Sequence, residues 1–399
     1  ADPVAIAEIQ GTGDTSPLVG QTVTTRGKVT GVYPTGGFNG YYIQTPGTGG
    51  ALDPANHTAS DAIFVFSADT VGAVAAGDYV EVTGTVGEYF GLTQLTVAAG
   101  NMSRLSEPAE EVKPASVAWP ASDAERETLE GMLLSPQGSF TVTDNYSLNQ
   151  YAEIGLAAGD SALVQPTAVA AVGTPEHAAV VADNAARAVK LDDGASTNFL
   201  SAANQGIPLP YLTLENPVRI GAAATFTTSV ILDFRNSAWK FQPLTALTAA
   251  NASEVAPASF EATRTAAPES VGGNLKLASF NVLNYFSTTG DSIAGCTYYP
   301  DRAGAPLTVR GGCDARGAAN AENLERQQAK IVAAINALGA DVVSLMEVEN
   351  SAVFGKDRDD ALANLTAALN EQAPGTWDYV RSPAALPDNE DVIRTAFIF

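Results

Sequence analysis

Two apolar stretches that each end in polar residues, joined by an amphipathic stretch, most constrain how this chain can fold. Residues 279–285 (SFNVLNY) and 342–350 (VVSLMEVEN) have the composition of buried strands, and residues 320–338 between them have the periodicity of a helix. A strand–helix–strand unit predicts an α/β arrangement in which the ends of both strands meet at one edge of a sheet.

The connecting helix carries its own start and stop signals. Asn320 is a good N-cap, and acidic residues follow it in the first turn, where they favour the helix dipole. Gly339 is suited to end the helix. One apolar face would pack on the sheet, and it consists of Leu324, Ile331, Ile335 and Leu338.

The polar strand ends favour a site for one hard cation. Asn281 contributes an amide and Glu347 a carboxylate, and oxygen ligands of this kind suit Mg²⁺, with Mn²⁺ or Ca²⁺ as alternatives. Asn284 and Glu349 lie next to them in sequence, and we expect them to support the two ligands. The simpler interpretation is that Asn281 caps a strand and that Glu347 is an acid of a surface turn.

These segments resemble the endonuclease/exonuclease/phosphatase superfamily, and the fuller match is to secreted bacterial nucleases of the ExeM/NucH type. The match covers the two strands, the Glu325-Arg326-Gln327 run of the helix and Met346-Glu347. Ala319 stands where those nucleases usually have Asp. The resemblance implies a DNase-like α/β four-layer sandwich, whose first part would be residues 274–399. It also implies a hydrolase that cleaves phosphodiester bonds of DNA, and of RNA as a further substrate, with metal-activated water.

The later motifs of that superfamily do not occur in these 399 residues. A Gly-Asp-X-Asn segment and a Ser-Asp-His segment are missing, and the two histidines, His57 and His177, lie far upstream. The chain stops at Phe399 inside an apolar, strand-like run. We therefore expect a longer polypeptide whose remaining catalytic residues lie beyond Phe399, so the catalytic base stays unknown. A degenerate homologue that has lost its catalytic half is the alternative.

The first part of the chain, residues 1–106, is predicted to be all-β. Short alternating strands separated by glycine-rich turns fit a small closed barrel of the oligonucleotide/oligosaccharide-binding (OB) type, which the secreted nucleases also carry. Such barrels bind single strands through aromatic and basic residues. The candidates here are Arg26, Lys28, Tyr41 and Tyr42. The competing interpretation is that strand alternation places about half of the aromatic residues in the core.

The remaining upstream residues are predicted to form a β-rich middle domain, residues 107–247, followed by a linker, residues 248–273. The linker is rich in Ala, Ser, Thr, Pro and Glu. Asp192-Asp193-Gly194 in the middle domain indicates a turn rather than a Ca²⁺ site. The chain would thus be multidomain, with the nuclease-like region last.

The charge balance limits how the protein can bind nucleic acid. The net charge is −23, of which residues 1–274, with 28 acidic and 11 basic residues, carry −17 and residues 275–399 carry −6. An acidic surface argues against tight, non-specific DNA binding, because phosphate neutralisation supplies most of that affinity. It leaves room for an enzyme that contacts only a few phosphates, and we expect that enzyme to be a monomer.

Two cysteines are the clearest pointer to the compartment. Cys296 and Cys313 have 16 residues between them, and we predict a disulfide bond that stabilises the fold by about 3 kcal/mol on the chain-entropy model. Ala1-Asp2-Pro3 resembles the start left after signal-peptide cleavage, so we expect a secreted protein. No apolar stretch is long enough to span a membrane.

Three function classes remain open at the level of the sequence. The first is an extracellular Mg²⁺-dependent endonuclease that degrades DNA. The second is another phosphoesterase of the same superfamily, such as a sphingomyelinase or a nucleotidase. The third is a non-catalytic binding or surface protein in which the barrel and the middle domain are the working parts.

Overall fold

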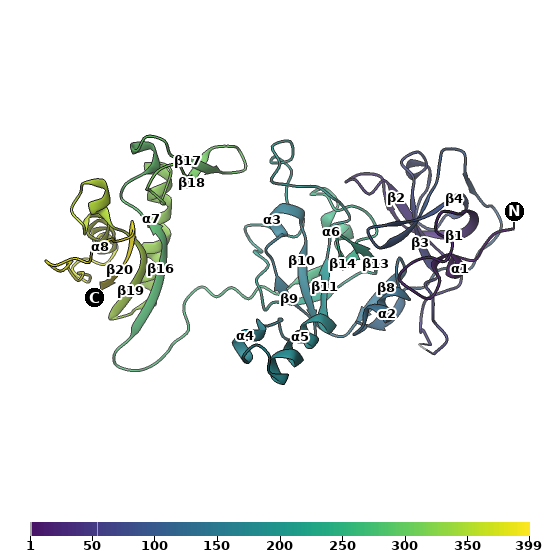
Figure 1. Ribbon diagram of the computed structural model, residues 1–399, viewed down its shortest axis with the longest axis horizontal. Helices are drawn as coiled ribbons and strands as arrows, with labels where there is room; N and C mark the ends of the chain where they lie inside the picture. The colour runs from purple at the N-terminus through teal and green to yellow at the C-terminus, as the bar shows by residue number, and fades with distance from the viewer. Residues whose placement is uncertain (1, 54) are drawn as a thin grey trace. The chain divides into compact units, whose positions relative to one another are not determined.

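The computed structural model describes residues 2–53 and 55–399, and the chain divides into two compact units, residues 1–264 and 265–399 (Figure 1). The boundary between the units falls inside the segment predicted as a linker. The first unit is rich in strands, and the second combines strands with helices, as predicted. Within the described residues no helix combines the length and the hydropathy needed to cross a membrane.

The first unit begins with a closed five-stranded barrel. Its strands follow the order β1-β2-β3-β5-β4, and β4 pairs back with β1 to close the ring. All neighbours are antiparallel except β3 and β5, which are parallel. The helix α1 (Ile6–Gln10) contributes Ile6 and Ile9 to the barrel core. The strands are β1 (Thr22–Tyr33), β2 (Gly40–Gln44), β3 (Ala62–Phe66), β4 (Tyr79–Tyr89) and β5 (Leu92–Thr96), with β6 (Met102–Arg104) added beside β4. The prediction of a small closed barrel is confirmed.

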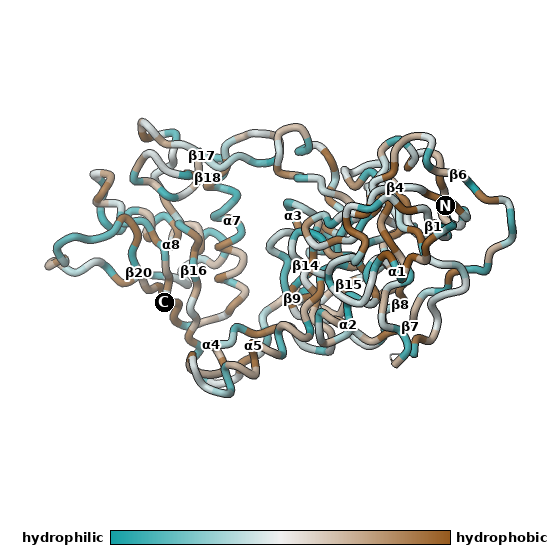
Figure 2. Tube along the Cα trace, turned by 45° about the vertical axis from the view of Figure 1, so that its right-hand side comes forward, coloured by the Kyte–Doolittle hydropathy of each residue, from teal (hydrophilic) through white to brown (hydrophobic). Residues whose placement is uncertain are grey.

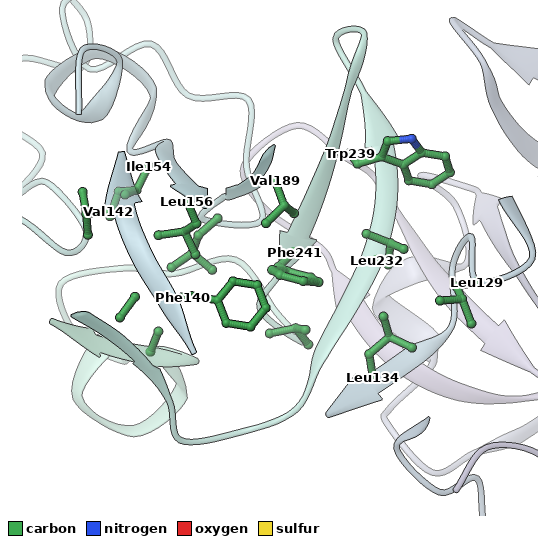
Figure 3. Packing of buried hydrophobic residues seen from close by; sticks show 14 of the residues in the cluster. Leu129, Leu134, Phe140, Val142, Ile154, Leu156, Val189, Leu232, Trp239 and Phe241 are labelled. Carbon is green, nitrogen blue, oxygen red and sulfur yellow. The ribbon is translucent and has the colours of Figure 1, made fainter. Parts of the chain in front are cut away.

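The rest of the first unit is a mixed nine-stranded sheet in the order β15-β12-β9-β10-β11-β14-β13-β8-β7. Its strands are β7 (Ala115–Ala118), β8 (Leu133–Gln137), β9 (Phe140–Asp144), β10 (Ile154–Ala158), β11 (Ala188–Leu191), β12 (Ala223–Phe226), β13 (Val230–Arg235), β14 (Ala238–Gln242) and β15 (Ala258–Phe260). Its helices are α2 (Asp123–Glu127), α3 (Leu148–Tyr151), α4 (Pro166–Val169), α5 (Pro175–Arg187) and α6 (Ala252–Val255). Figure 3 shows the core on this sheet, in which Phe140 and Phe241 lie among aliphatic side chains.

The barrel and the nine-stranded sheet share a core. Tyr42 and Phe64 of the barrel pack with Leu133 and Ile231 of the sheet. Gly31 permits this approach, because a Cβ atom there would lie 2.6 Å from Ile231 Cδ1. Figure 2 shows hydrophobic residues along the barrel strands β1 and β4 and more hydrophilic residues in many of the loops. The barrel and the sheet therefore bury each other within one unit.

A buried polar cluster lies within the nine-stranded sheet. Lys240 Nζ contacts Asp192 Oδ2 at 3.3 Å and Glu153 Oε2 at 2.6 Å, while Gln242 Nε2 donates to both Asp192 and Asp233. Asp193 accepts a hydrogen bond from the Ala195 amide, as expected of the predicted turn. Asp192, Asp193 and Asp233 are almost without solvent exposure, and each accepts at least one hydrogen bond within the protein.

The structure differs from the predicted linker in its first half. Residues 258–260 form β15, which pairs with β12 through Thr225 and Ser259. A segment rich in Ala and Ser thus completes the edge of the sheet, where few side chains need to be large.

The second unit holds the predicted strand–helix–strand element. Its sheet has the order β16-β19-β20, with β16 (Leu277–Tyr285) parallel to β19 (Val342–Glu349) and β20 (Ile393–Ile398) antiparallel to β19. The helices α7 (Ala321–Leu338) and α8 (Asp360–Gln372) contribute to the core with the sheet. On α7, Ile331, Val332 and Ile335 are buried. The remaining layers of a four-layer sandwich stay a prediction.

The predicted disulfide is present between Cys296 and Cys313. The cysteines bracket a hairpin of two short strands, β17 (Thr297–Pro300) and β18 (Pro306–Gly311), in the connection between β16 and α7. Phe286, at the end of β16, packs with Val309 of this hairpin. The disulfide therefore closes the base of the hairpin, and the packing of Phe286 on Val309 connects the hairpin with the end of β16.

Candidate metal site at the sheet edge

Regular pairing of β16 and β19 ends just where the candidate ligands lie. The strands pair in register from Leu277↔Val342 to Asn281↔Met346, and the next pair is Tyr285↔Val348. Four residues of β16 thus span two of β19, so β16 bulges after Asn281. Bulges of this kind re-aim side chains and are common beside functional sites.

The bulge contains residues in an unusual backbone conformation. Leu283 and Asn284 on β16 have φ of 51°, and Glu347 on β19 has φ of 64°. This left-handed region is uncommon for residues other than glycine, and each instance costs about 1–3 kcal/mol. Three such residues next to one another indicate that the surrounding fold maintains a strained edge.

The strained edge brings the two candidate ligands into direct contact. Asn281 Nδ2 donates to Glu347 Oε1 at 2.8 Å, and the backbone amide of Asn284 donates to Glu347 Oε2 at 3.2 Å. The side-chain oxygen of Asn281 accepts from the Leu283 amide at 2.8 Å. The expected convergence of Asn281 and Glu347 is therefore observed. Their metal-binding role stays a prediction.

The helix α7 holds the bulge in place. Gln327 Nε2 donates to the carbonyls of Leu283, at 2.8 Å, and Val282, at 3.2 Å. The Tyr285 hydroxyl donates to Gln328 Oε1 at 2.6 Å. Without these donors the two displaced carbonyls would lack partners from the sheet. The pattern of residues singled out the Glu-Arg-Gln run but gave no indication that its glutamine braces the strand end.

Glu349, predicted to support the ligands, has a different set of partners. Its buried carboxylate accepts from the hydroxyls of Ser287, at 3.1 Å, and Ser351, and from the Thr288 amide at 3.0 Å. It therefore fixes the segment that follows β16. Burial, together with the charges of Asp360 and Glu349, raises the pKa of the Tyr285 hydroxyl, so Tyr285 stays a hydrogen-bond donor at neutral pH. Asn284 supports Glu347 through its backbone.

The chemistry of the donor set fits a hard cation. A carboxylate has about four lone-pair positions, and the Glu347 carboxylate accepts two hydrogen bonds from Asn281 and Asn284. The Asn281 amide oxygen accepts one and retains a second lone pair. Mg²⁺ is commonly bound by only one or two protein carboxylates, with water and phosphate as its other ligands. Within residues 2–53 and 55–399 there is no cluster of three or more His, Cys, Asp or Glu suited to a metal.

The four barrel residues predicted to bind nucleic acid do not form an exposed surface, and that prediction is wrong in its tyrosines. Tyr41 and Tyr42 have no solvent exposure, and the Tyr42 hydroxyl donates to Asp233 at 2.8 Å. Strand β2 is buried on both faces, because the barrel interior covers one face and the nine-stranded sheet the other. The rings cannot stack on bases in this fold.

The two basic barrel residues are paired with acids. Arg26 contacts Glu81 at 2.7 Å and Glu107 at 3.1 Å. Lys28 is buried and paired with Glu111. Their charges are compensated within the protein, so they offer little attraction to phosphate.

Comparison with known proteins adds no assignment to this geometry. Neither the models of known protein families nor the curated protein sequences give a match to this chain. The functional argument therefore depends on the residues of the sheet edge and their contacts.

Proposed function

We propose that this protein is a secreted, metal-dependent nuclease that hydrolyses phosphodiester bonds of DNA. The observation that carries the proposal is the strained junction of the parallel strands β16 and β19. It holds Asn281 Nδ2 2.8 Å from Glu347 Oε1 at the edge of the sheet. Ligand sites of open α/β sheets are found outside the carboxyl ends of the strands. The disulfide supports an oxidising, extracellular setting.

In this proposal Glu347 and the Asn281 side-chain oxygen hold the cation. Bound Mg²⁺ supplies charge stabilisation for the phosphate and lowers the pKa of bound water. The Asn284 amide orients the Glu347 carboxylate, and Gln327 keeps the Leu283 carbonyl paired, so the ligands need little reorganisation. The base that accepts the proton from water has no assigned residue in this unit.

Cation binding by this chain is the first test, and it needs no turnover. Isothermal titration with Mn²⁺ should show one site, and Glu347→Gln should weaken it at least about tenfold, because a charged ligand is lost. Glu371→Gln, at an exposed position on α8, is the matched control and should bind as the parent does. Equal binding by Glu347→Gln and the parent would remove the ligand assignment.

Cleavage is the second test, made with the natural gene product. Supercoiled plasmid should be nicked in Mg²⁺ and remain intact in EDTA. Release of phosphocholine from sphingomyelin, or of phosphate from mononucleotides, without plasmid nicking would favour another phosphoesterase. If the parent protein neither binds the cation nor hydrolyses any of these substrates, the third class, a non-catalytic binding protein, would be favoured.

A further inference from the structure

A small aromatic cavity lies on the first unit, and its lining differs from the four barrel residues that the sequence singled out. Its volume is about 200 Å³. Its walls come from three barrel segments, from the junction of β13 and β14, and from Ser196 in the segment that follows β11. The side chains that matter for the argument are Phe38, Phe64, Phe66, Tyr89, Phe90 and Arg235.

The rim of the cavity is an aromatic turn in a strained conformation. Tyr89 and Phe90, at the tip of the β4–β5 hairpin, are 54% and 77% exposed, and their rings meet edge to face at 4.9 Å. Phe90 has φ of 51°, an unfavourable value for a bulky residue. A Cβ atom at the next residue, Gly91, would lie 2.9 Å from the ring of Phe234, so the tip packs directly on β13. The fold thus holds two aromatic rings in solvent-exposed positions.

Arg235, which lines the cavity, is a planar cation whose charge is balanced by Asp233. The Arg235 guanidinium lies 3.9 Å from the ring centre of Phe38 and 4.7 Å from that of Phe64. Its Nε donates to Asp233 at 2.6 Å. Although burial opposes the charge, Tyr42 and Asp233 raise the pKa of Arg235, so the cation persists at every physiological pH. The planar Arg235 guanidinium and its Asp233 partner together carry no net charge.

The residues that line the cavity limit the class of ligand that it suits. None of the described residues that line the cavity is Asp or Glu, in a chain with 44 acidic and 21 basic residues. Polar contacts are available from Gln94, Asn236 and Ser196. Sites for drug-sized ligands enclose about 300–1,000 Å³, so this smaller cavity suits a single ring with a polar edge. Stacking on exposed aromatic rings together with edge hydrogen bonds is how proteins hold unpaired bases.

We propose that this cavity binds one nucleobase of single-stranded DNA, with Tyr89 and Phe90 as the stacking residues. The inference rests on the proposed function for the choice of DNA, and it gives the barrel a role in holding substrate. Base stacking also suits an acidic protein, because it needs little phosphate neutralisation. We expect a shallow salt dependence, with a slope of about one or less, since at most one cation faces the ligand.

The test measures binding of a labelled oligodeoxythymidylate to the whole chain in EDTA by fluorescence anisotropy. The double variant Tyr89→Ala/Phe90→Ala should bind about tenfold more weakly or worse, the order expected for one stacked base. Tyr146→Ala is the control, because Tyr146 is 88% exposed and does not line the cavity. It should bind as the parent does.

Two further arms identify what is bound and protect the test from misfolding. An abasic oligomer of the same length should not compete, whereas competition by it would show phosphate binding and overturn the inference. Competition by a neutral oligosaccharide alone would assign the cavity to sugars and also overturn it. Phe90→Gly removes the ring and the backbone strain together, so it should fold normally, by circular dichroism, and still bind weakly.

The outcomes separate this inference from the proposed nuclease activity. Binding in EDTA that depends on Tyr89 and Phe90, without any cleavage in Mg²⁺, would refute only the nuclease proposal. Cleavage with no change of affinity in the double variant would refute only the nucleobase site. A parent chain that fails to bind oligodeoxythymidylate at millimolar concentration would also refute the nucleobase site.

Discussion

Three buried or half-buried carboxylates of the first unit differ from two arginine-paired carboxylates of the second. In the first unit, burial raises the pKa of Asp193 to about 8 and that of Glu127 to about 7, and it also raises the pKa of Asp192. Asp193 Oδ2 has no hydrogen-bond partner among the described residues. Burial is the largest cause of all three shifts, and for Asp192 it outweighs the contacts with Lys240 and Gln242.

In the second unit, the carboxylates of Asp359 and Glu390 are paired with arginine. Hydrogen bonds from Arg358 lower the pKa of Glu390. Burial opposes the charge of Asp359, but hydrogen bonds from Ser382 and the charge of Arg394, whose Nη2 lies 2.7 Å away, lower its pKa. The comparison teaches that acidic composition alone does not tell whether an acid is a protonated core residue or a charged surface group. The balance between burial and the hydrogen-bond donors and cations around each carboxylate decides between these two states.

The largest effect that would test the comparison is expected at the shared core of the first unit. Asp233→Ala would leave Arg235 buried without its partner, and it would also remove the acceptor of Tyr42. We expect the first unit to lose about 3–5 kcal/mol of unfolding free energy. Urea unfolding followed by hydrogen exchange should show the loss in residues 1–264. An unchanged midpoint there would contradict the structural role of this acid.

The next effect concerns activity. Glu347→Gln should lower plasmid cleavage at least about a hundredfold, because it removes the charged ligand of the proposed cation. It should leave the melting temperature within about 2 °C of the parent, since Glu347 is only partly buried. A large loss of stability without loss of cleavage would place Glu347 with the structural acids of the first unit.

The pH dependence should have opposite signs in the two units. The folded pKa of Asp193, about 8, exceeds its ordinary value of 3.8, so the folded state holds a proton that the unfolded state releases between these values. Stability of the first unit should therefore fall as pH rises from about 4 to 8, by an amount worth several degrees, and Asp193→Asn should flatten the slope. Differential scanning calorimetry at pH 5 and pH 8 checks this, and a rise with pH would reject the assignment.

The lowered pKa values of the second unit predict the reverse. Asp359 and Glu390 bind protons less readily when folded, so their contribution is present above their ordinary pKa values and is lost as the pH falls below about 4. The second unit should consequently be the first to unfold in acid. Simultaneous acid unfolding of both units would remove the contrast.

The smallest effect is expected at Gln327, the residue of α7 that holds the bulge in β16. Gln327→Ala removes both donors to the displaced carbonyls of Val282 and Leu283, which should cost about 1–2 kcal/mol and weaken Mn²⁺ binding about tenfold. Gln372→Ala, at the exposed end of α8, provides the control. Unchanged cation affinity in Gln327→Ala would mean that the bulge keeps its shape without the brace.

The elements of the second unit could be predicted from local patterns, but their distortion could not. Periodicity located α7 and both parallel strands, and cysteine spacing located the disulfide. The left-handed conformation of Leu283 and Glu347 depends on contacts with α7 and on a register change between strands. No sequence window contains that information, because the partners are more than forty residues apart.

The barrel shows the same limit for burial. Alternation along β2 predicted that one of Tyr41 and Tyr42 would face solvent, as in a strand with one covered face. Both are buried, because the nine-stranded sheet covers the outer face. The exposed rings of Tyr89 and Phe90 lie in a turn, where alternation makes no prediction, and their part in a cavity depends on Arg235 some 145 residues later.

The disulfide has a consequence for what a single proteolytic cut would do to this protein. Proteases cut most readily at exposed loop tips, and the β17–β18 hairpin is one, with Arg302 and Arg310 inside the bracket formed by Cys296 and Cys313. A cut there would leave the two fragments covalently joined, with β16 on one and α7 on the other. The nick would be invisible on a gel run without reductant. The two fragments could separate only after the disulfide was reduced, so the redox state of the medium would decide when a nicked chain comes apart.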